Sequence, residues 1–189
     1  VLWQRHYPQK YSSDCIGLWS AADADAEFRQ IFAKHMRKII CLREPEAVGS
    51  GRYISKNNAN IARIDALTHM FPDARILVPF RHPIEHAVSL WRQHRNFIRQ
   101  HSENSFVMDY MAYIGHYEFG RLHRPIAFPG LEDLTAGRTA DTLDYWLAYW
   151  IAGFEYLVAK RQVELFEYET LCGNPREGLT TLCGELGID

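Results

Sequence analysis

Apolar residues along most of this chain recur at the spacing of amphipathic helices, and proline or glycine separates the stretches. The pattern predicts helices from Asp25 to the break at Pro45, through Ile61–Phe71, from Pro83 through Ile98, over 105–117, over 141–160 and from Pro175 to Gly187. Residues 118–140 contain several prolines and glycines and predict a long loop. Residues 1–24 lack periodicity and predict loop or short helix.

Short segments between these helices have the composition of strands, namely Arg52–Ser55, Arg75–Phe80 and Val163–Glu167. The second is continuously apolar at its centre, as expected for a strand that helices cover on both faces. Because helices separate the segments, right-handed crossovers would make the strands parallel. The pattern therefore predicts a single α/β domain over residues 1–189 with no internal boundary.

Composition excludes several classes of function. A net charge of −2 over 189 residues leaves no polybasic footprint for nucleic acid. The nine histidines show no paired metal-ligand spacing, and the four cysteines form no CxxC motif, which favours a reduced, cytoplasmic setting. The most apolar run, 143–159, contains acidic residues and is short for a bilayer. We therefore expect a cytoplasmic protein without a metal, a nucleic-acid partner or an integral membrane segment.

Polar residues follow the three predicted strands. Lys56 follows the first, Arg81 the second, and the pair Tyr168-Glu169 the third. In parallel α/β sheets these ends share one edge, where phosphates bind. Arginine offers an oxyanion a planar fork, and lysine a mobile point charge. The helix after Arg81 points its positive end at the same edge, and its Ser89 lies about 9 Å along the axis.

The order of these residues resembles a known family. Lys56-Asn57-Asn58, a helix, then residues 71–75 (FPDAR), a buried strand, Arg81-His82-Pro83 and Ser89 resemble the nucleotide-dependent sulfotransferases, most of all their bacterial branch. Residues 166–171 (FEYETL) with Asn174-Pro175 are similar to the ending of that family. The likeness covers about residues 25–189.

The resemblance implies a P-loop-NTPase-like three-layer sandwich, with a central parallel sheet flanked by helices. It implies transfer of a sulfuryl group from 3'-phosphoadenosine 5'-phosphosulfate (PAPS) to a hydroxyl or amine, without a metal. Arg81 and Ser89 would hold the 3'-phosphate of the donor, and Lys56 would stabilise charge that develops at the transferring group. Many relatives have a histidine base where this chain has Asn58. The base is therefore expected to be His94, with His86 and Glu169 as alternatives.

One part of the family pattern is missing. The Gly/Arg/Ser/Thr-rich loop that binds the 5'-phosphosulfate is not found, and no GxxxxGK[ST] motif occurs. The segment Gly49-Ser50-Gly51-Arg52 precedes a predicted strand and is expected to be a plain turn. We therefore expect the domain to be truncated at its N-terminus. Two other functions stay open: a nucleotide kinase-like phosphoryl transferase and a non-catalytic nucleotide-binding domain. Small-molecule, carbohydrate, lipid and peptide acceptors also stay open.

The candidate residues also have ordinary structural interpretations. Arg81 could pair with Asp65 or Glu85, Lys56 could be solvated, and Ser89 could be a polar-face residue of its helix. The aromatic stripes at 106–117 and 143–157 are expected in the core. Cys172 and Cys183 are expected to be small buried side chains.

Overall fold

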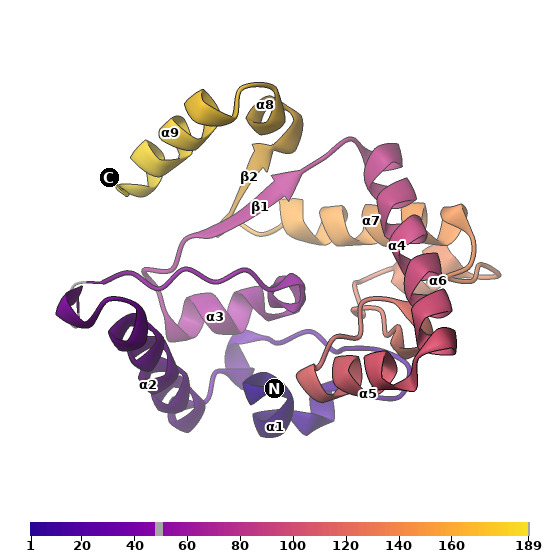
Figure 1. The fold of residues 1–189 in the computed structure, drawn as a ribbon, viewed down its shortest axis with the longest axis horizontal. Coiled ribbons are helices and arrows are strands. Elements are labelled where there is room, and N and C mark those ends of the chain that lie inside the picture. The colour runs from indigo at the N-terminus through magenta and orange to yellow at the C-terminus, as the bar shows by residue number, and fades with distance from the viewer. Residues whose placement is uncertain (48–50, 189) are drawn as a thin grey trace.

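The computed structural model describes residues 1–47 and 51–188, and in this part the chain is mixed α/β, mostly helical with a small parallel sheet (Figure 1). The α-helices are α1 (Leu2–His6), α2 (Ala26–Arg43), α3 (Ile64–Met70), α4 (Pro83–Glu103), α5 (Ser105–Ile114), α6 (Leu131–Thr135), α7 (Leu143–Val158), α8 (Tyr168–Gly173) and α9 (Pro175–Leu186). Turns of 3₁₀-helix are η1 (Pro8–Lys10), η2 (Ala21–Asp23), η3 (Pro45–Ala47), η4 (Asn58–Arg63) and η5 (Gly120–Leu122). The strands are β1 (Ile76–Phe80) and β2 (Val163–Glu167).

All of the predicted helices are confirmed, and local chemistry accounts for their ends. Asp25 caps α2 by accepting the backbone N–H of Glu27, and α4 has Pro83 in its first turn. Gly115 and Gly187 end α5 and α9 with positive φ, which costs glycine no steric energy. Residues 118–140, predicted to be a long loop, contain η5 and α6. The prolines and glycines of this segment interrupt the apolar periodicity, so the sequence pattern did not predict these short helices.

The small sheet pairs β1 with β2 in parallel, from Ile76 opposite Val163 to Phe80 opposite Glu167. This confirms two of the expected strands and their direction. The strand expected at Arg52–Ser55 is wrong, because these residues are extended but belong to no ladder. Arg52 instead donates to the carbonyl of Leu186 at 2.6 Å, and Ile54 is 76% exposed.

The three-layer sandwich is not confirmed in the described residues, because only β1 and β2 form its sheet there. The segment 51–57 and β1 both run from left to right in Figure 1, and α3, which connects them along the chain, runs in the opposite direction. Of the turn expected at Gly49-Ser50-Gly51-Arg52, the first two residues lie outside the described residues.

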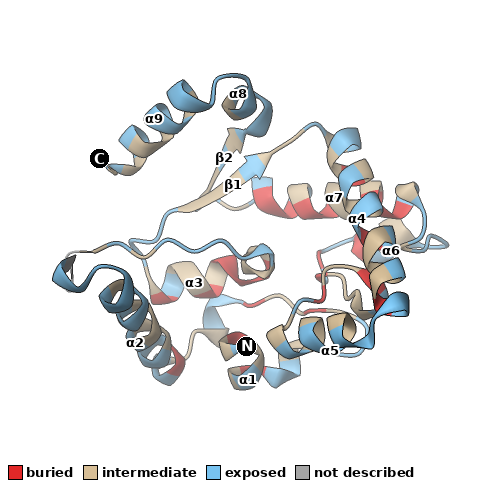
Figure 2. Ribbon diagram, in the orientation of Figure 1, coloured by how far each residue is buried: buried red, intermediate tan, exposed pale blue. Residues whose placement is uncertain are grey.

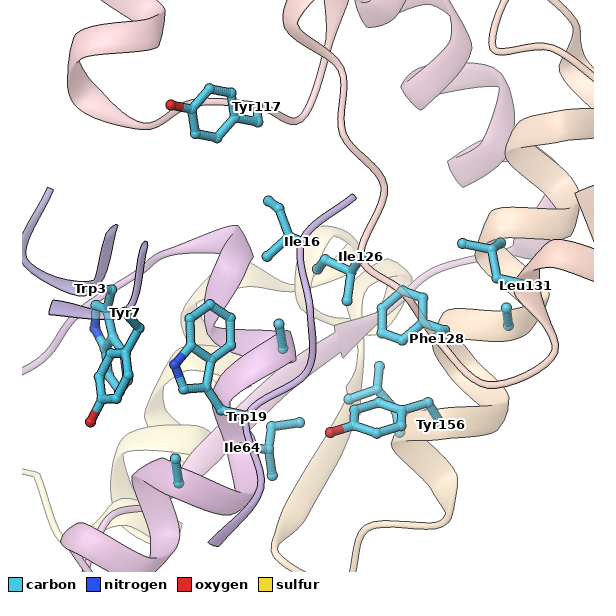
Figure 3. Close-up of a cluster of buried hydrophobic side chains, with 14 of the residues drawn as sticks. Trp3, Tyr7, Ile16, Trp19, Ile64, Tyr117, Ile126, Phe128, Leu131 and Tyr156 are labelled. Carbon is cyan, nitrogen blue, oxygen red and sulfur yellow. The ribbon is translucent and has the colours of Figure 1, made fainter. Parts of the chain in front are cut away.

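The main core joins α3 and α7 to the N-terminal segment, and Figure 2 shows that burial concentrates there while α8 and α9 are largely exposed. Trp3, Tyr7 and Trp19 come from the segment without periodicity, yet they lie together in this core near Ile64 (Figure 3). Trp19 is fully buried at 0% exposure. A buried aromatic side chain of this size contributes roughly 2–3 kcal/mol, so the segment is part of the core.

A second cluster fixes the orientation of α4. Ala87 on α4 packs with Tyr145 and Trp146 of α7, and His94 of α4 lies on the same buried side. The polar face of α4 that contains Ser89 is therefore left facing outward.

The segment after α5 is held against α4 by its backbone. Gly120 donates its N–H to Nδ1 of His94 at 3.2 Å, and Arg121 donates its N–H to Nδ1 of His101 at 3.2 Å. Gly120 has φ +73°, and a Cβ at this position would lie 2.7 Å from the His101 ring. Glycine is therefore required where η5 meets α4.

Two predictions of burial are wrong. Phe106 and Tyr113 of α5 are 69% and 70% exposed, because α5 has no element packed on its outer face among the described residues. Cys172 is exposed on α8, whereas Cys183 is half-buried, and all four cysteines are free thiols. The cytoplasmic location expected from the cysteines stays a prediction. Within residues 1–47 and 51–188, no helix has both the length and the apolar character needed to cross a membrane.

Candidate active site

An open groove of about 620 Å³ runs along the outward face of α4 and begins at the end of β1. It is lined by Arg81, Ile84, Glu85, Val88, Ser89, Arg92, Gln93 and Asn96. The structure thus brings the predicted residues Arg81 and Ser89 to one surface. The cause is local: β1 ends at Phe80, and Pro83 starts a helix whose apolar face is buried against α7.

The guanidinium of Arg81 lies half-buried at the head of this groove, between two carboxylates. Its Nη2 lies 3.4 Å from Oε2 of Glu85, and its Nε lies 4.0 Å from Oε1 of Glu169. Tyr168 supplies an aromatic face 5.5 Å away. The predicted pairing with Glu85 is therefore present, while Asp65 instead binds Lys160 at 2.6 Å. The contact with Glu85 is long for a hydrogen bond, which leaves Arg81 available to an anion.

Glu169 joins the ends of the two strands. Its Oε1 accepts a hydrogen bond from the backbone N–H of His82 at 3.0 Å. That hydrogen bond lowers the pKa of the Glu169 carboxyl, and the charge of Arg81 lowers it further. The predicted convergence of Arg81 with the pair Tyr168-Glu169 at one sheet edge is therefore what the structure contains.

Lys56 lies elsewhere on the surface. It is exposed at the end of the extended segment 51–57, and it does not line the groove. No hydrogen bond or ion pair joins its ammonium to another of the described residues. The next residue, Asn57, caps η4 by accepting the backbone N–H of Ala59 at 2.9 Å. With respect to the described residues, Lys56 is therefore an unpaired cation beside a fixed turn.

His94 is held inside the protein by packing contacts. It is 3% exposed, on the α4 side that faces α7. Its ring lies 5.3 Å from that of Trp146, its Nδ1 accepts the N–H of Gly120, and its Nε2 lies 4.0 Å from Asp141 Oδ1. Burial lowers the pKa of His94 below its ordinary value. The residues that line the groove do not include His94.

The other two candidate bases differ in their surroundings. His86 accepts a hydrogen bond from the indole of Trp150 at 3.2 Å, and burial lowers its pKa. Glu169 contacts the start of α4, and its Oε1 lies 4.0 Å from Nε of the groove residue Arg81.

Comparison with known proteins identifies the family. The sequence model of the sulfotransferase family matches residues 3–189. The chain belongs to the sulfotransferase family. No curated protein and no solved structure matches it. Family membership indicates sulfuryl transfer as the general activity, and it extends the likeness to the N-terminal segment, whose tryptophans are buried in the core.

One residue that lines the groove of this sulfotransferase-family chain was not predicted from its sequence. Arg92 is an exposed cation three residues after Ser89, on the same face of α4. Its spacing from Ser89 was a usable signal, since residues three apart on a helix are neighbours. No cluster of three or more metal-binding side chains occurs within the described parts of the chain.

Proposed function

We propose that this domain binds PAPS and transfers its sulfuryl group to a hydroxyl or amine acceptor. The observation that supports it best is the groove on α4, in which Arg81 and Ser89 lie on one surface in a chain of the sulfotransferase family. In this proposal both residues bind the 3'-phosphate of the donor. Arg81 supplies a charged fork of donors, and Ser89 a hydroxyl further along the helix.

Electrostatics favours an anion at this place. Arg81 and Arg92 are the cations of the groove, and Glu85 is its carboxylate. A phosphate that displaces the 3.4 Å contact between Arg81 and Glu85 exchanges a long, exposed ion pair for charge-assisted hydrogen bonds. The N-terminus of α4 also favours negative charge, because its first backbone N–H groups point out of the helix.

The transfer step needs a cation at the leaving group. The acceptor oxygen or nitrogen attacks sulfur, and the bond from sulfur to the 5'-phosphate oxygen breaks. The electron pair stays on that oxygen, and the acceptor proton passes to a base. Lys56 is proposed to donate to the oxygen on which charge develops.

The base remains the open part of the proposal. A base must contact the acceptor, and the burial of His94 argues for a positioning role instead. Glu169 is the better candidate, because its carboxylate is exposed and lies 4.0 Å from the groove residue Arg81. The parallel pairing of β1 and β2, with α4 after the carboxyl end of β1, supports the P-loop-like arrangement that the family resemblance implies.

A non-catalytic nucleotide-binding domain is the competing function. It is favoured by one observation, that Lys56 does not line the groove that contains Arg81. Binding of the nucleotide without turnover on any acceptor would support this alternative. The nucleotide kinase-like alternative has no supporting contact in the described residues.

The experiment is calorimetry with 3'-phosphoadenosine 5'-phosphate (PAP). The wild type is expected to bind it, and Arg81→Ala is expected to lose at least about tenfold in affinity, since a charged hydrogen bond contributes about 1.5–3 kcal/mol. Arg95→Ala is the control, because Arg95 is an exposed arginine of α4 that does not line the groove. Lack of binding at millimolar PAP, or equal losses in the two variants, would refute the proposal. Release of PAP from PAPS over an acceptor panel then separates catalysis from binding.

A further inference from the structure

Arg63 is a buried cation that has no acidic partner among the residues that the structure describes. The side chain ends η4 and is only 4% exposed. Its guanidinium lies against two indole rings, 4.8 Å from the centroid of Trp3 and 5.2 Å from that of Trp19. No carboxylate of the described residues lies within ion-pair distance of it. Desolvation lowers the pKa of Arg63, so its place in the core requires specific compensation.

The compensation comes from contacts that suit the planar, forked head of arginine. Nη2 of Arg63 donates to the hydroxyl of Tyr11 at 2.7 Å, and Nη1 donates to Oδ1 of Asn60 at 3.1 Å. The rings of Trp3 and Trp19, which meet edge to face, both lie against the guanidinium (both rings are labelled in Figure 3). A lysine ammonium is a compact, more strongly hydrated charge without the fixed fork of arginine, so it fits these contacts less well.

Hydrogen bonds continue from Arg63 to the residue after Lys56. Asn60, which accepts from Arg63, donates its backbone N–H to the carbonyl of Asn57 at 3.0 Å. Asn57 in turn accepts the N–H of Ala59 with its side chain at 2.9 Å. The other end of η4 is tied to the core, since the N–H of Trp19 donates to the carbonyl of Ala62 at 2.8 Å.

We propose that Arg63 is a positioning residue for Lys56. The ammonium of Lys56 makes no hydrogen bond or ion pair within the described parts of the chain. The position of its backbone is therefore set by the turn that follows it. Arg63 connects that turn to the aromatic core through Asn60. This proposal rests on the proposed role of Lys56 in sulfuryl transfer. A displacement of about 1 Å can cost a reaction roughly a hundredfold in rate.

The first test reports on the position of Lys56 and does not depend on enzymatic activity. Trypsin cleaves after Lys56 and after Lys34, an exposed lysine of α2 that serves as the internal reference. Arg63→Lys and the milder Asn60→Ala are expected to speed cleavage after Lys56 about tenfold and to leave cleavage after Lys34 unchanged. Arg124→Lys is the matched control, because Arg124 stacks on Tyr117 at 4.2 Å and lies outside η4. An equal change at both lysines, or no change at either, would overturn the proposal.

The second test is a double-mutant cycle on sulfuryl transfer, measured as PAP release. Arg63→Lys is expected to lower kcat about tenfold with an unchanged KM for PAPS. In the Lys56→Met background the same substitution is expected to cost nothing further. Losses that add would show a general structural role and would overturn the positioning role. If the wild type transfers no sulfuryl group, the proposed function fails, while the cleavage result still decides whether Arg63 fixes the position of Lys56.

Discussion

The carboxylate of Glu169 accepts the backbone N–H of His82, with a distance of 3.0 Å between Oε1 and the nitrogen. This hydrogen bond ties the residue pair after β2 to the start of α4. It also puts a negative charge beside Arg81, whose Nε lies 4.0 Å from the same oxygen. Glu169 therefore orders the groove and at the same time opposes the anion that we propose to bind there.

Glu169→Gln separates these two effects. The amide oxygen can still accept from His82, but the negative charge is gone. We expect PAP to bind about threefold to fivefold more tightly, because the repulsion between the carboxylate and the phosphate is removed. Calorimetry at low and physiological salt checks this, and the gain should shrink as salt rises. Weaker binding by this variant would show that the charge of Glu169 is needed to hold Arg81.

Ser89→Ala tests the far end of the groove. The Ser89 hydroxyl makes no hydrogen bond with the described residues, so its removal should leave the free energy of unfolding nearly unchanged. It should weaken PAP binding roughly fivefold, which is the contribution of one hydrogen bond. Ser102→Ala, on the same helix and outside the groove, serves as the control. The interpretation of Ser89 as a plain polar-face residue would be supported if the two variants bound PAP alike.

Gly120→Ala should be among the most destabilising single methyl additions in this chain. The backbone φ of +73° costs alanine about 1–2 kcal/mol, and the new Cβ would clash with the His101 ring, 2.7 Å away. Gly137→Ala is the matched control, because φ is +71° there and nothing lies within 4 Å of a Cβ. We expect urea unfolding to show a larger loss for Gly120→Ala by about 1–3 kcal/mol. Equal losses would mean that η5 is free to move away from α4.

Acid should destabilise the fold through His123. Its Nδ1 donates to the carbonyl of Glu118 at 2.7 Å, and its Nε2 accepts from the hydroxyl of Tyr145 at 2.8 Å. Burial lowers its pKa from 6.5 to about 4, so the folded state keeps the ring neutral. Between pH 6.5 and about pH 4 this histidine is protonated in the unfolded chain and neutral in the folded chain. The stabilisation is therefore complete above pH 6.5 and is lost as pH falls toward 4.

This pH dependence can be measured by urea unfolding. Between pH 7.5 and pH 4.5 we expect a loss of about 2.5 kcal/mol from His123, with losses in the same direction from His94 and His101, whose pKa values burial also lowers. His123→Gln should be less stable at pH 7.5 and should show a shallower dependence on pH. A slope identical to that of the wild type would assign the acid sensitivity to other groups.

Local signals made much of the fold predictable. Apolar spacing located the helices, and Pro83 and Gly187 marked ends that the structure confirms. The expected strand at Arg52–Ser55 failed for a tertiary reason. A short polar segment forms a strand only if a partner offers its edge, and Arg52 instead binds the carbonyls at the end of α9.

The candidate site was predictable in part. The strand end before Pro83 located Arg81, and the family resemblance singled out Ser89 in the helix that follows, and the structure has both on one surface. The buried position of His94 could not be predicted in the same way. Whether a histidine of an amphipathic helix faces solvent or the interior depends on which helix covers it, here α7, and its partner Gly120 is 26 residues away in the sequence.

The sequence by itself determined the helices and the two strand segments, because each depends on neighbours within a few residues, and its motifs named Arg81 and Ser89 as candidate anion-binding residues. Only the tertiary structure decided what lies inside. It buried Trp3 and Trp19 from a segment without periodicity and Arg63 from η4, and it placed Lys56 outside the groove. The physical reason is that burial and the pairing of charges depend on contacts between residues far apart in the chain, and no local pattern records those contacts.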